Sequence, residues 1–205
     1  MKFFAACLIL VASAFAITAD EAMAKSKAWF SSSKSWSFDF SVETVMANSP
    51  GVGSQRGSML VSEGDKFRLS IPGITFISDG VNYWQWNEQQ NQVLIKLVED
   101  LESKMHPSEL LFKYLNCKAL SIKETSWRNG KVWALSLSPS AYAGQFVEME
   151  VWLSQKDFSP VRLFTVDEVG NSSWYDISKL KVVKKVSDAD FTFKASPGID
   201  EIDMR

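Results

Sequence analysis

Residues that could perform chemistry are few in this chain, and they do not form a catalytic set. His106 is the only histidine, so any histidine-based dyad depends on it alone, and histidine-rich metal sites are excluded. It precedes Pro107 at the predicted start of a helix, where a capping or solvent-exposed histidine is more common than a general base. Ser108 is close in sequence, but no orienting acid or oxyanion-hole motif accompanies it.

The acidic residues also give no indication of an active site. They cluster in predicted turns and at strand ends, where solvated carboxylates are the usual case, and spacing alone assigns none of them to a hydrolase pair. The clusters are Glu99, Asp100 and Glu102; Asp167 and Glu168; and Asp188 and Asp190. The sequence contains no P-loop or dinucleotide-binding fingerprint. We therefore expect no enzymatic activity, no cofactor and no metal site.

The charge balance argues against a nucleic-acid partner. The chain carries a formal net charge of -2 at pH 7, whereas phosphate neutralisation needs a concentrated basic surface. One local cluster contains Lys179, Lys181, Lys184 and Lys185. We interpret it as the solvated face and edge of a strand, because edge strands are commonly guarded by lysine. A patch for phosphate or lipid head groups is the alternative.

The first residues are typical of a secretory signal peptide, which we place at 1–19. Lys2 supplies a basic start, and the apolar run Phe3 to Phe15 is shorter than the roughly 20 residues that a membrane-spanning helix needs. Cleavage would follow either Ala16 or Ala19. The sequence therefore predicts export across the inner membrane to the periplasm.

Residues 20–205 are predicted to form a single domain, whose stability must come from its core. Cys117 is the only cysteine in this part, so an intramolecular disulfide is excluded. The same part retains all eight tryptophans of the chain. Such an aromatic composition indicates either an unusually aromatic core or a lining that is not filled.

The stretch from Gly57 to Trp86 is a predicted β-meander. Its apolar runs are Ser58 to Val61, Phe67 to Ile71 and Ile74 to Ser78, with a fourth starting at Tyr83; the separating turns are Glu63-Gly64-Asp65, Pro72-Gly73 and Asp79-Gly80. These turn residues favour short hairpin connections, which require antiparallel neighbours. Alternation places Phe67 and Leu69 on one face, and Trp84 and Trp86 alternate with polar or amphipathic residues in the same way.

Outside the meander the chain is mostly β, with two predicted helices. Further strands are expected at 36–43, 93–98, 122–127, 132–137, 146–153, 161–166, 172–183 (bent near Ser178) and 191–193, the last closing the sheet before a terminal loop at 196–200. One helix, at 20–33, has its apolar side at Met23, Ala24, Ala28 and Trp29. The other, at 107–117, carries a stripe of Leu110, Leu111, Tyr114 and Leu115, which makes it a candidate lid.

The fold class that follows is mainly β (α+β). A long antiparallel sheet tends to curl into a barrel or half-barrel. We expect an incomplete antiparallel β-barrel of about 10–11 strands, with a short helical lid over a hydrophobic cavity.

The sequence resembles the periplasmic lipoprotein carriers of the LolA family over nearly the whole exported part. The matching pieces, in order, are Gly57-Ser-Met-Leu-Val, Lys66-Phe67-Arg68, Ile77-Ser-Asp79-Gly80 with Tyr83-Trp84, and Phe191-Thr-Phe193 leading to Pro197-Gly198. The resemblance implies an incomplete barrel closed by helices that holds lipoprotein acyl chains between the inner and outer membranes. It departs from the family at Glu63-Gly64, where an Arg-Pro pair is usual and the arginine fastens the helical lid.

The predicted function is therefore a periplasmic carrier of lipoprotein acyl chains. Its partners would be acylated lipoproteins or another lipid, an inner-membrane releasing complex and an outer-membrane acceptor, and the carrier itself is expected to be a monomer. The alternative is a periplasmic sensor or interaction module, or a carrier of another amphiphile, on the same scaffold. The predicted lipid-binding residues are Phe40, Phe67, Leu69, Ile71, Phe76, Trp84, Trp86, Leu111, Tyr114, Val147, Met149 and Val151. Ordinary core packing remains the alternative for each of them.

Overall fold

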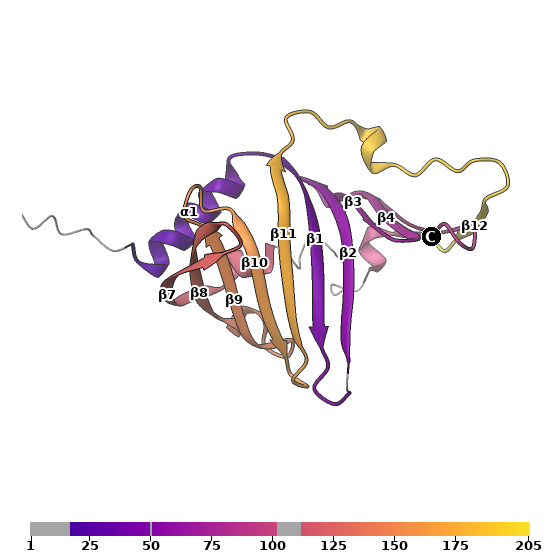
Figure 1. Ribbon diagram of the computed structural model, residues 1–205. Coiled ribbons are helices and arrows are strands. Elements are labelled where there is room, and N and C mark those ends of the chain that lie inside the picture. Colours follow the sequence, from indigo (N-terminus) through magenta and orange to yellow (C-terminus); the bar gives the residue numbers. More distant parts are fainter. Residues whose placement is uncertain (1–16, 50, 102–111) are drawn as a thin grey trace, which may run out of the picture.

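The computed structural model describes residues 17–49, 51–101 and 112–205, and its main element is one open β-sheet (Figure 1). The described residues form twelve strands in the order β12-β6-β5-β4-β3-β2-β1-β11-β10-β9-β8-β7. Neighbouring strands are antiparallel, except that β12 runs parallel to β6. The predicted fold class is confirmed, with one strand more than the upper expectation and one parallel pair.

The elements have the following bounds. The strands are β1 (Ser35–Val45), β2 (Val52–Ser62), β3 (Lys66–Ile71), β4 (Ile74–Asp79), β5 (Asn82–Asn87), β6 (Gln92–Leu97), β7 (Lys118–Trp127), β8 (Gly130–Ser138), β9 (Phe146–Ser154), β10 (Pro160–Asp167), β11 (Ser172–Val182) and β12 (Asp200–Asp203). The helices are α1 (Ala19–Ser31) and the short 3₁₀ helices η1 (Val98–Asp100), η3 (Lys113–Asn116), η4 (Pro139–Tyr142) and η5 (Asp188–Phe191).

The turns of the predicted meander form as expected. Gly64 and Asp65 adopt positive φ angles of 72° and 57° between β2 and β3, and Gly73 adopts 80° between β3 and β4. These are left-handed conformations that glycine, and to a lesser degree aspartate, adopts at little cost. The short connections make β2 to β6 consecutive antiparallel neighbours.

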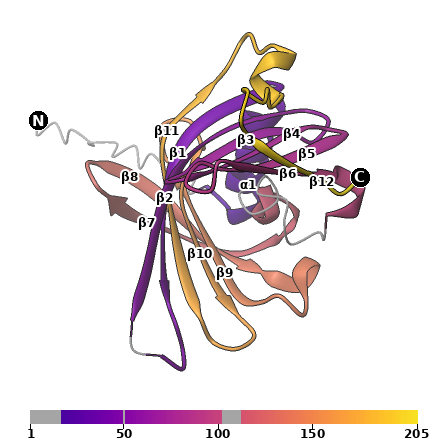
Figure 2. The same ribbon diagram turned by 90° about the vertical axis from the view of Figure 1, so that its right-hand side faces the viewer.

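The sheet bends where β1 pairs with β11. The register shifts between Ser37 and Asp39, and Lys179 in β11 has a φ of 52°. This irregularity confirms the bend predicted near Ser178. Figure 2 shows the two arms of the sheet, β3 to β6 with β12 and β7 to β10, diverging from β1, β2 and β11.

Helix α1 is held at its start by a capping box. Thr18 Oγ1 accepts a hydrogen bond from the Glu21 backbone N–H at 3.2 Å, and the Glu21 carboxylate accepts one from the Thr18 N–H at 2.8 Å. The predicted helix is confirmed, and so is the inward placement of Met23 and Trp29, but that of Ala24 and Ala28 is wrong. The buried residues of α1 are Ala22, Met23, Ser26 and Phe30, whereas Ala24 and Ala28 are exposed. The large Phe30 side chain orients the helix, and the two small alanines do not.

The C-terminal segment corrects two further predictions. Phe191 to Phe193 do not form a closing strand: η5, which contacts β3 and β4, ends at Phe191, and the chain then continues to β12 (Figure 1). The predicted terminal loop instead leads into β12, which adds to the sheet along β6. The physical reason is Arg68, which donates hydrogen bonds to the carbonyl oxygens of Asp190 (2.8 Å) and Thr192 (3.3 Å) and so occupies backbone acceptors that a strand would use.

Three apolar clusters make up the described core. The first packs α1 and η3 on β7 to β10, the second lies on β1 to β5 and β11, and the third lies between β4 to β6 and the C-terminal segment. Trp36 and Phe112 contact both the first and the second cluster. The first two clusters therefore share one face of the sheet, the concave face, and the third lies on the other.

Candidate functional site

Four predicted lining residues gather on the concave face of β1, β3 and β4. They are Phe40, Leu69, Ile71 and Phe76, and each is only partly buried. Leu69 lies opposite Phe76 in the β3–β4 register, and opposite residues of paired strands share a face. A fifth predicted residue, Phe67, is on the same face but fully buried. This part of the sheet thus presents a partly open apolar surface.

Gly57 allows the residues of this surface to approach β2 closely. It lies opposite Phe40 in the β1–β2 register. A β-carbon at position 57 would lie 2.8 Å from Phe40 Cζ, 2.9 Å from Ile71 Cγ2 and 2.4 Å from the backbone oxygen of Ser70. Side chains from β1 and β3 therefore occupy the space above Gly57, and no larger residue fits there without movement of the backbone.

On the other arm, the predicted lining residues are part of a filled core. Met149 and Val151 are buried beneath α1, and Cys117 Sγ lies 3.7 Å from Met149 Sδ. Tyr114 is fully buried, and its hydroxyl shares a 2.8 Å hydrogen bond with Ser26 Oγ. Burial raises the pKa of Tyr114, and the hydrogen bond from Ser26 opposes that rise. These side chains hold α1 in place.

The structure places Trp84 and Trp86 away from the proposed lining. Trp84 pairs in register with Ile77, and both belong to the cluster on the outer face, where the Trp86 ring lies 5.4 Å from the Phe193 ring. Because successive side chains of a strand point to opposite faces, Tyr83 occupies the concave face and Trp84 does not. The sequence-based inclusion of both tryptophans in the lining is therefore corrected.

Of the two remaining predicted lining residues, one is exposed to solvent and the other lies outside the described residues. Val147 lies near the start of β9 and is 58% exposed. Leu111 lies outside the described residues, as does most of the predicted lid helix at 107–117. The described end of that segment is the 3₁₀ helix η3, preceded by Phe112.

An aromatic opening lies at the β2–β3 turn, on the concave side of the sheet. It has a volume of about 320 Å³ and is lined by Phe30, Trp36, Val61, Ser62, Glu63, Gly64, Asp65 and Phe112. The Phe30 ring centroid lies 5.0 Å from that of Phe112 and 5.7 Å from that of Trp36. Sequence reasoning missed these three aromatic residues. Trp36 alternates with Phe38 and Phe40 along the same strand, and this alternation could have placed it on the concave face.

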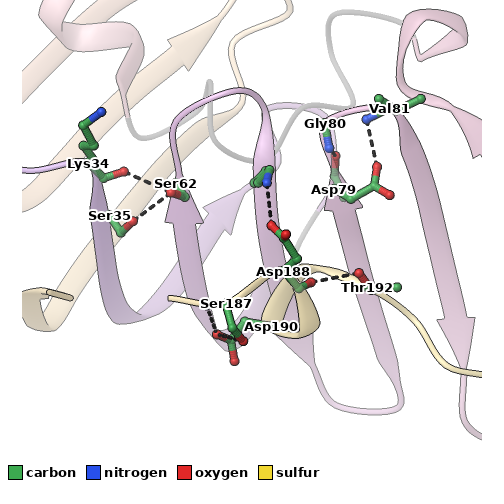
Figure 3. Close-up of polar contacts among 12 residues, drawn as sticks. Lys34, Ser35, Ser62, Asp79, Gly80, Val81, Ser187, Asp188, Asp190 and Thr192 are labelled. Carbon is green, nitrogen blue, oxygen red and sulfur yellow. Dashed lines mark hydrogen bonds and ion pairs between the residues drawn. The ribbon is translucent and has the colours of Figure 1, made fainter. Parts of the chain in front are cut away.

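The rim of this opening is fastened to the start of β1. Glu63 pairs with Lys34 at 3.1 Å. The hydroxyls of Ser35 and Ser62 share a 2.7 Å hydrogen bond (Figure 3). Ser62 Oγ also donates to the Lys34 carbonyl oxygen at 3.2 Å. The β2–β3 turn is thus tied to the connection between α1 and β1.

The described residues offer no metal centre and no membrane span. Within residues 17–49, 51–101 and 112–205, no group of three or more His, Cys, Asp or Glu side chains could hold a metal ion. No helix of this described part has the length and apolar character needed to cross a membrane.

Comparison with known proteins assigns the chain to a family. The sequence model of the family described as outer membrane lipoprotein carrier protein LolA matches residues 31–194. The chain belongs to the LolA family. An outer-membrane lipoprotein carrier protein of Bordetella avium (strain 197N) is 27% identical over 204 residues, which cover 98% of this chain and 95% of that protein.

One solved structure has a similar fold. It is an uncharacterized conserved protein from Thermus thermophilus, with a TM-score of 0.58 and 14% sequence identity, covering 90% of this chain and 98% of that one. The likeness shows a shared fold. LolA proteins are periplasmic carriers that bind lipoproteins, and the family is not an enzyme family. The resemblance to LolA drawn from the sequence is confirmed.

Proposed function

We propose that this member of the LolA family shelters the acyl chains of lipoproteins as they pass from the inner to the outer membrane. The sheltering surface would be the concave surface formed by Phe40, Leu69, Ile71 and Phe76. The main support for this proposal is that these four side chains share one face and remain partly exposed. The aromatic opening at Phe30, Trp36 and Phe112 lies on the same side of the sheet, towards the β2–β3 turn. An inner-membrane releasing complex and an outer-membrane acceptor are the expected partners.

The energetics suit a carrier that must also release. An acyl chain gains about 0.8 kcal/mol for each methylene that is removed from water. A surface that covers the chain incompletely captures part of this gain and leaves the rest available to the membrane or to an acceptor. A tightly closed pocket would retain the chain.

Export requires removal of the signal peptide, and we propose that cleavage follows Ala16. Ile17 packs against the core cluster beneath α1, and Thr18 forms the capping box of that helix. Cleavage after Ala19 would remove both residues. The intact mass of the secreted protein should therefore correspond to a chain that starts at Ile17, and a start at Asp20 would contradict this site.

Native mass spectrometry of the protein purified from the periplasm tests the carrier function. The unaltered protein should retain an adduct of lipid or lipoprotein mass. Leu69→Glu and Phe76→Glu should each abolish the adduct, because they place a carboxylate on the apolar surface. Val169→Glu is the matched control, since Val169 is 65% exposed in the β10–β11 turn.

Circular dichroism must first show that all variants are folded, so that loss of the adduct reports on lipid binding and not on unfolding. Adduct retained by Leu69→Glu and Phe76→Glu would mean that the lipid does not occupy this surface. Adduct lost equally in Val169→Glu would mean that an added charge acts non-specifically, which would also overturn the assignment.

A further inference from the structure

A buried hydrogen-bond donor on the concave side of the sheet has been left without a partner. The indole Nε1–H of Trp36 is buried, and it has no hydrogen-bond partner among the described residues. Buried tryptophan N–H groups usually find an acceptor, because a donor that is withdrawn from water and left unpaired destabilises the fold. The packing of the Trp36 ring alone does not account for this donor.

Trp36 belongs to the lining of the aromatic opening, whose volume is about 320 Å³. Its ring centroid lies 5.7 Å from that of Phe30 and 6.0 Å from that of Phe112. Phenyl rings offer no oxygen or nitrogen atom that could accept the indole proton. The opening therefore combines an apolar wall with a donor that the described part of the chain leaves unused.

The polar side chains at the rim of the opening do not supply the acceptor. Ser62 Oγ is engaged with the Ser35 hydroxyl at 2.7 Å and with the Lys34 carbonyl oxygen at 3.2 Å (Figure 3). The Glu63 carboxylate pairs with the Lys34 ammonium at 3.1 Å. A water molecule is also poorly suited, because a buried water typically makes about three hydrogen bonds and the wall beside Trp36 is aromatic. The acceptor should therefore belong to a molecule that is otherwise apolar.

The acceptor should also be neutral. The carboxylates of Glu63 and Asp65 belong to the lining and would repel an anion. The lysines of the cluster at 179–185 are not part of the described lining and so cannot offset them. That cluster does not guard a strand edge either, because β11 lies inside the sheet between β1 and β10, and its sequence-based interpretation is wrong. A neutral ester or amide carbonyl fits this opening better than a carboxylate or a phosphate.

Trp127 provides an internal comparison. Its indole Nε1–H also lacks a hydrogen-bond partner among the described residues. Trp127 lies on the outer face, where the Arg162 guanidinium covers its ring at 3.8 Å from the centroid, and it does not belong to the described lining of the opening. An unpaired indole N–H alone is therefore no sign of a ligand. At Trp36 the same feature coincides with an apolar opening.

We propose that the Trp36 indole N–H donates a hydrogen bond to the carbonyl oxygen that joins an acyl chain to the rest of the cargo. This inference rests on the proposed carrier function and adds the group by which the cargo is recognised. Trp36 and Phe40 lie on the same strand and face, about 13 Å apart. The donor is thus at one end of the apolar surface, where it would fix how far the chain extends along that surface.

Isothermal titration calorimetry with two single-chain lipids tests the proposal. Lysophosphatidylcholine and its ether-linked analogue of equal chain length, used below their micelle-forming concentrations, differ only in the ester carbonyl. The unaltered protein should bind the ester lipid about fivefold more tightly, as expected for one neutral hydrogen bond. Trp36→Phe keeps an aromatic ring but removes the donor, so it should abolish this preference and leave the affinity for the ether lipid nearly unchanged. Trp127→Phe is the matched control and should keep the preference.

Nuclear magnetic resonance separates a hydrogen bond from a packing role. In protein with ¹⁵N-labelled tryptophan, the indole signal of Trp36 is assigned by its absence from the spectrum of Trp36→Phe. This signal should move downfield in the proton dimension when the ester lipid binds. The ether lipid should not cause the downfield shift, because it brings no carbonyl oxygen to the indole.

The outcomes distinguish this inference from the carrier function. Equal affinity for the two lipids in the unaltered protein, or an equal loss of both in folded Trp36→Phe, would overturn the carbonyl contact and leave the carrier function standing. The same conclusion would follow if the Trp36 signal responded identically to both lipids. Tighter binding of a free fatty acid anion of equal chain length would overturn the neutral acceptor. Binding of neither lipid would contradict the carrier function itself.

Discussion

The concave face of β7 to β10 is covered by α1, whereas the same face of β1, β3 and β4 keeps Phe40, Leu69 and Phe76 partly exposed. The covered arm contains fully buried residues such as Leu135 and Leu153. Because large-to-small changes cost most where side chains are close-packed, the two arms should respond differently to mutation. The difference separates a structural arm from the arm proposed to bind acyl chains, which we call the binding arm.

On the outer face of the sheet, the arm that is covered by an apolar cluster is the one formed by β4 to β6. Over β4 to β6, the C-terminal segment covers Trp84 with Phe193 and Ile199. On β10 and its neighbours, the Arg162 guanidinium instead lies 3.8 Å from the Trp127 ring centroid and 4.1 Å from that of Trp174. The binding arm therefore has a core on its outer side in addition to the cluster on its concave face, where Leu69 and Phe76 stay partly exposed.

The largest expected effect compares one leucine from each arm. Leu153→Ala should lower the free energy of unfolding by about 3 kcal/mol, because it leaves a cavity beneath α1. Leu69→Ala should cost less than about 1 kcal/mol, since its side chain is partly exposed already. Urea denaturation followed by circular dichroism measures both, and equal losses would remove the distinction between the arms.

The next effect concerns the attachment of the C-terminal segment. Arg68→Ala should cost about 2 kcal/mol, because it removes charged donors from the carbonyl oxygens of Asp190 and Thr192. Hydrogen exchange should accelerate at residues 188–193. Lys66→Ala is the control, since its ion pair with the 90% exposed Asp188 should contribute little. Unchanged exchange in Arg68→Ala would show that other contacts hold the segment.

A smaller effect is expected at the contact between α1 and η3. Ser26→Ala leaves the buried Tyr114 hydroxyl without its 2.8 Å partner and should cost about 1.5 kcal/mol. Adding Tyr114→Phe should recover part of that loss, because the unpaired hydroxyl is then removed. Thermal unfolding of the two single variants and the double variant gives the coupling energy, and strictly additive losses would contradict the interaction.

The smallest effect is a dependence on alkaline pH. Burial raises the pKa of Tyr83, on the binding arm, to about 12 from the usual value of 10.0. The unfolded chain therefore releases this proton first, and stability falls as pH rises through the window from 10 to 12. The loss attributable to Tyr83 should reach about 1 kcal/mol at about pH 11. Tyr83→Phe should show a shallower decline than the unaltered protein, and identical slopes would contradict the shift.

Sequence reasoning located nearly all strands because their turns are determined locally. Gly64 and Gly73 adopt the left-handed angles that their turns require, whatever the rest of the chain does. It failed where a face had to be chosen. In β5, Tyr83 and Trp84 are both aromatic, so alternation alone could not tell which of them lies inside.

Long-range contacts account for the remaining errors. Phe191-Thr-Phe193 has the alternation of a strand, but Arg68 from β3 holds its backbone outside the sheet. Likewise, Ser26 is buried on α1 because Tyr114 meets it from 88 residues away in sequence. Neither partner is visible in the local pattern.

The parallel strand β12 has a consequence for solubility. An open sheet exposes unpaired backbone groups at its margins, where another chain could add a strand. Asp200, Glu201 and Asp203 place carboxylates along one margin, and like charges on a second copy would repel it. A chain that ended before Asp200 would instead present the Val93 and Ile95 strand to solvent, and it should aggregate at concentrations where the complete protein stays dispersed.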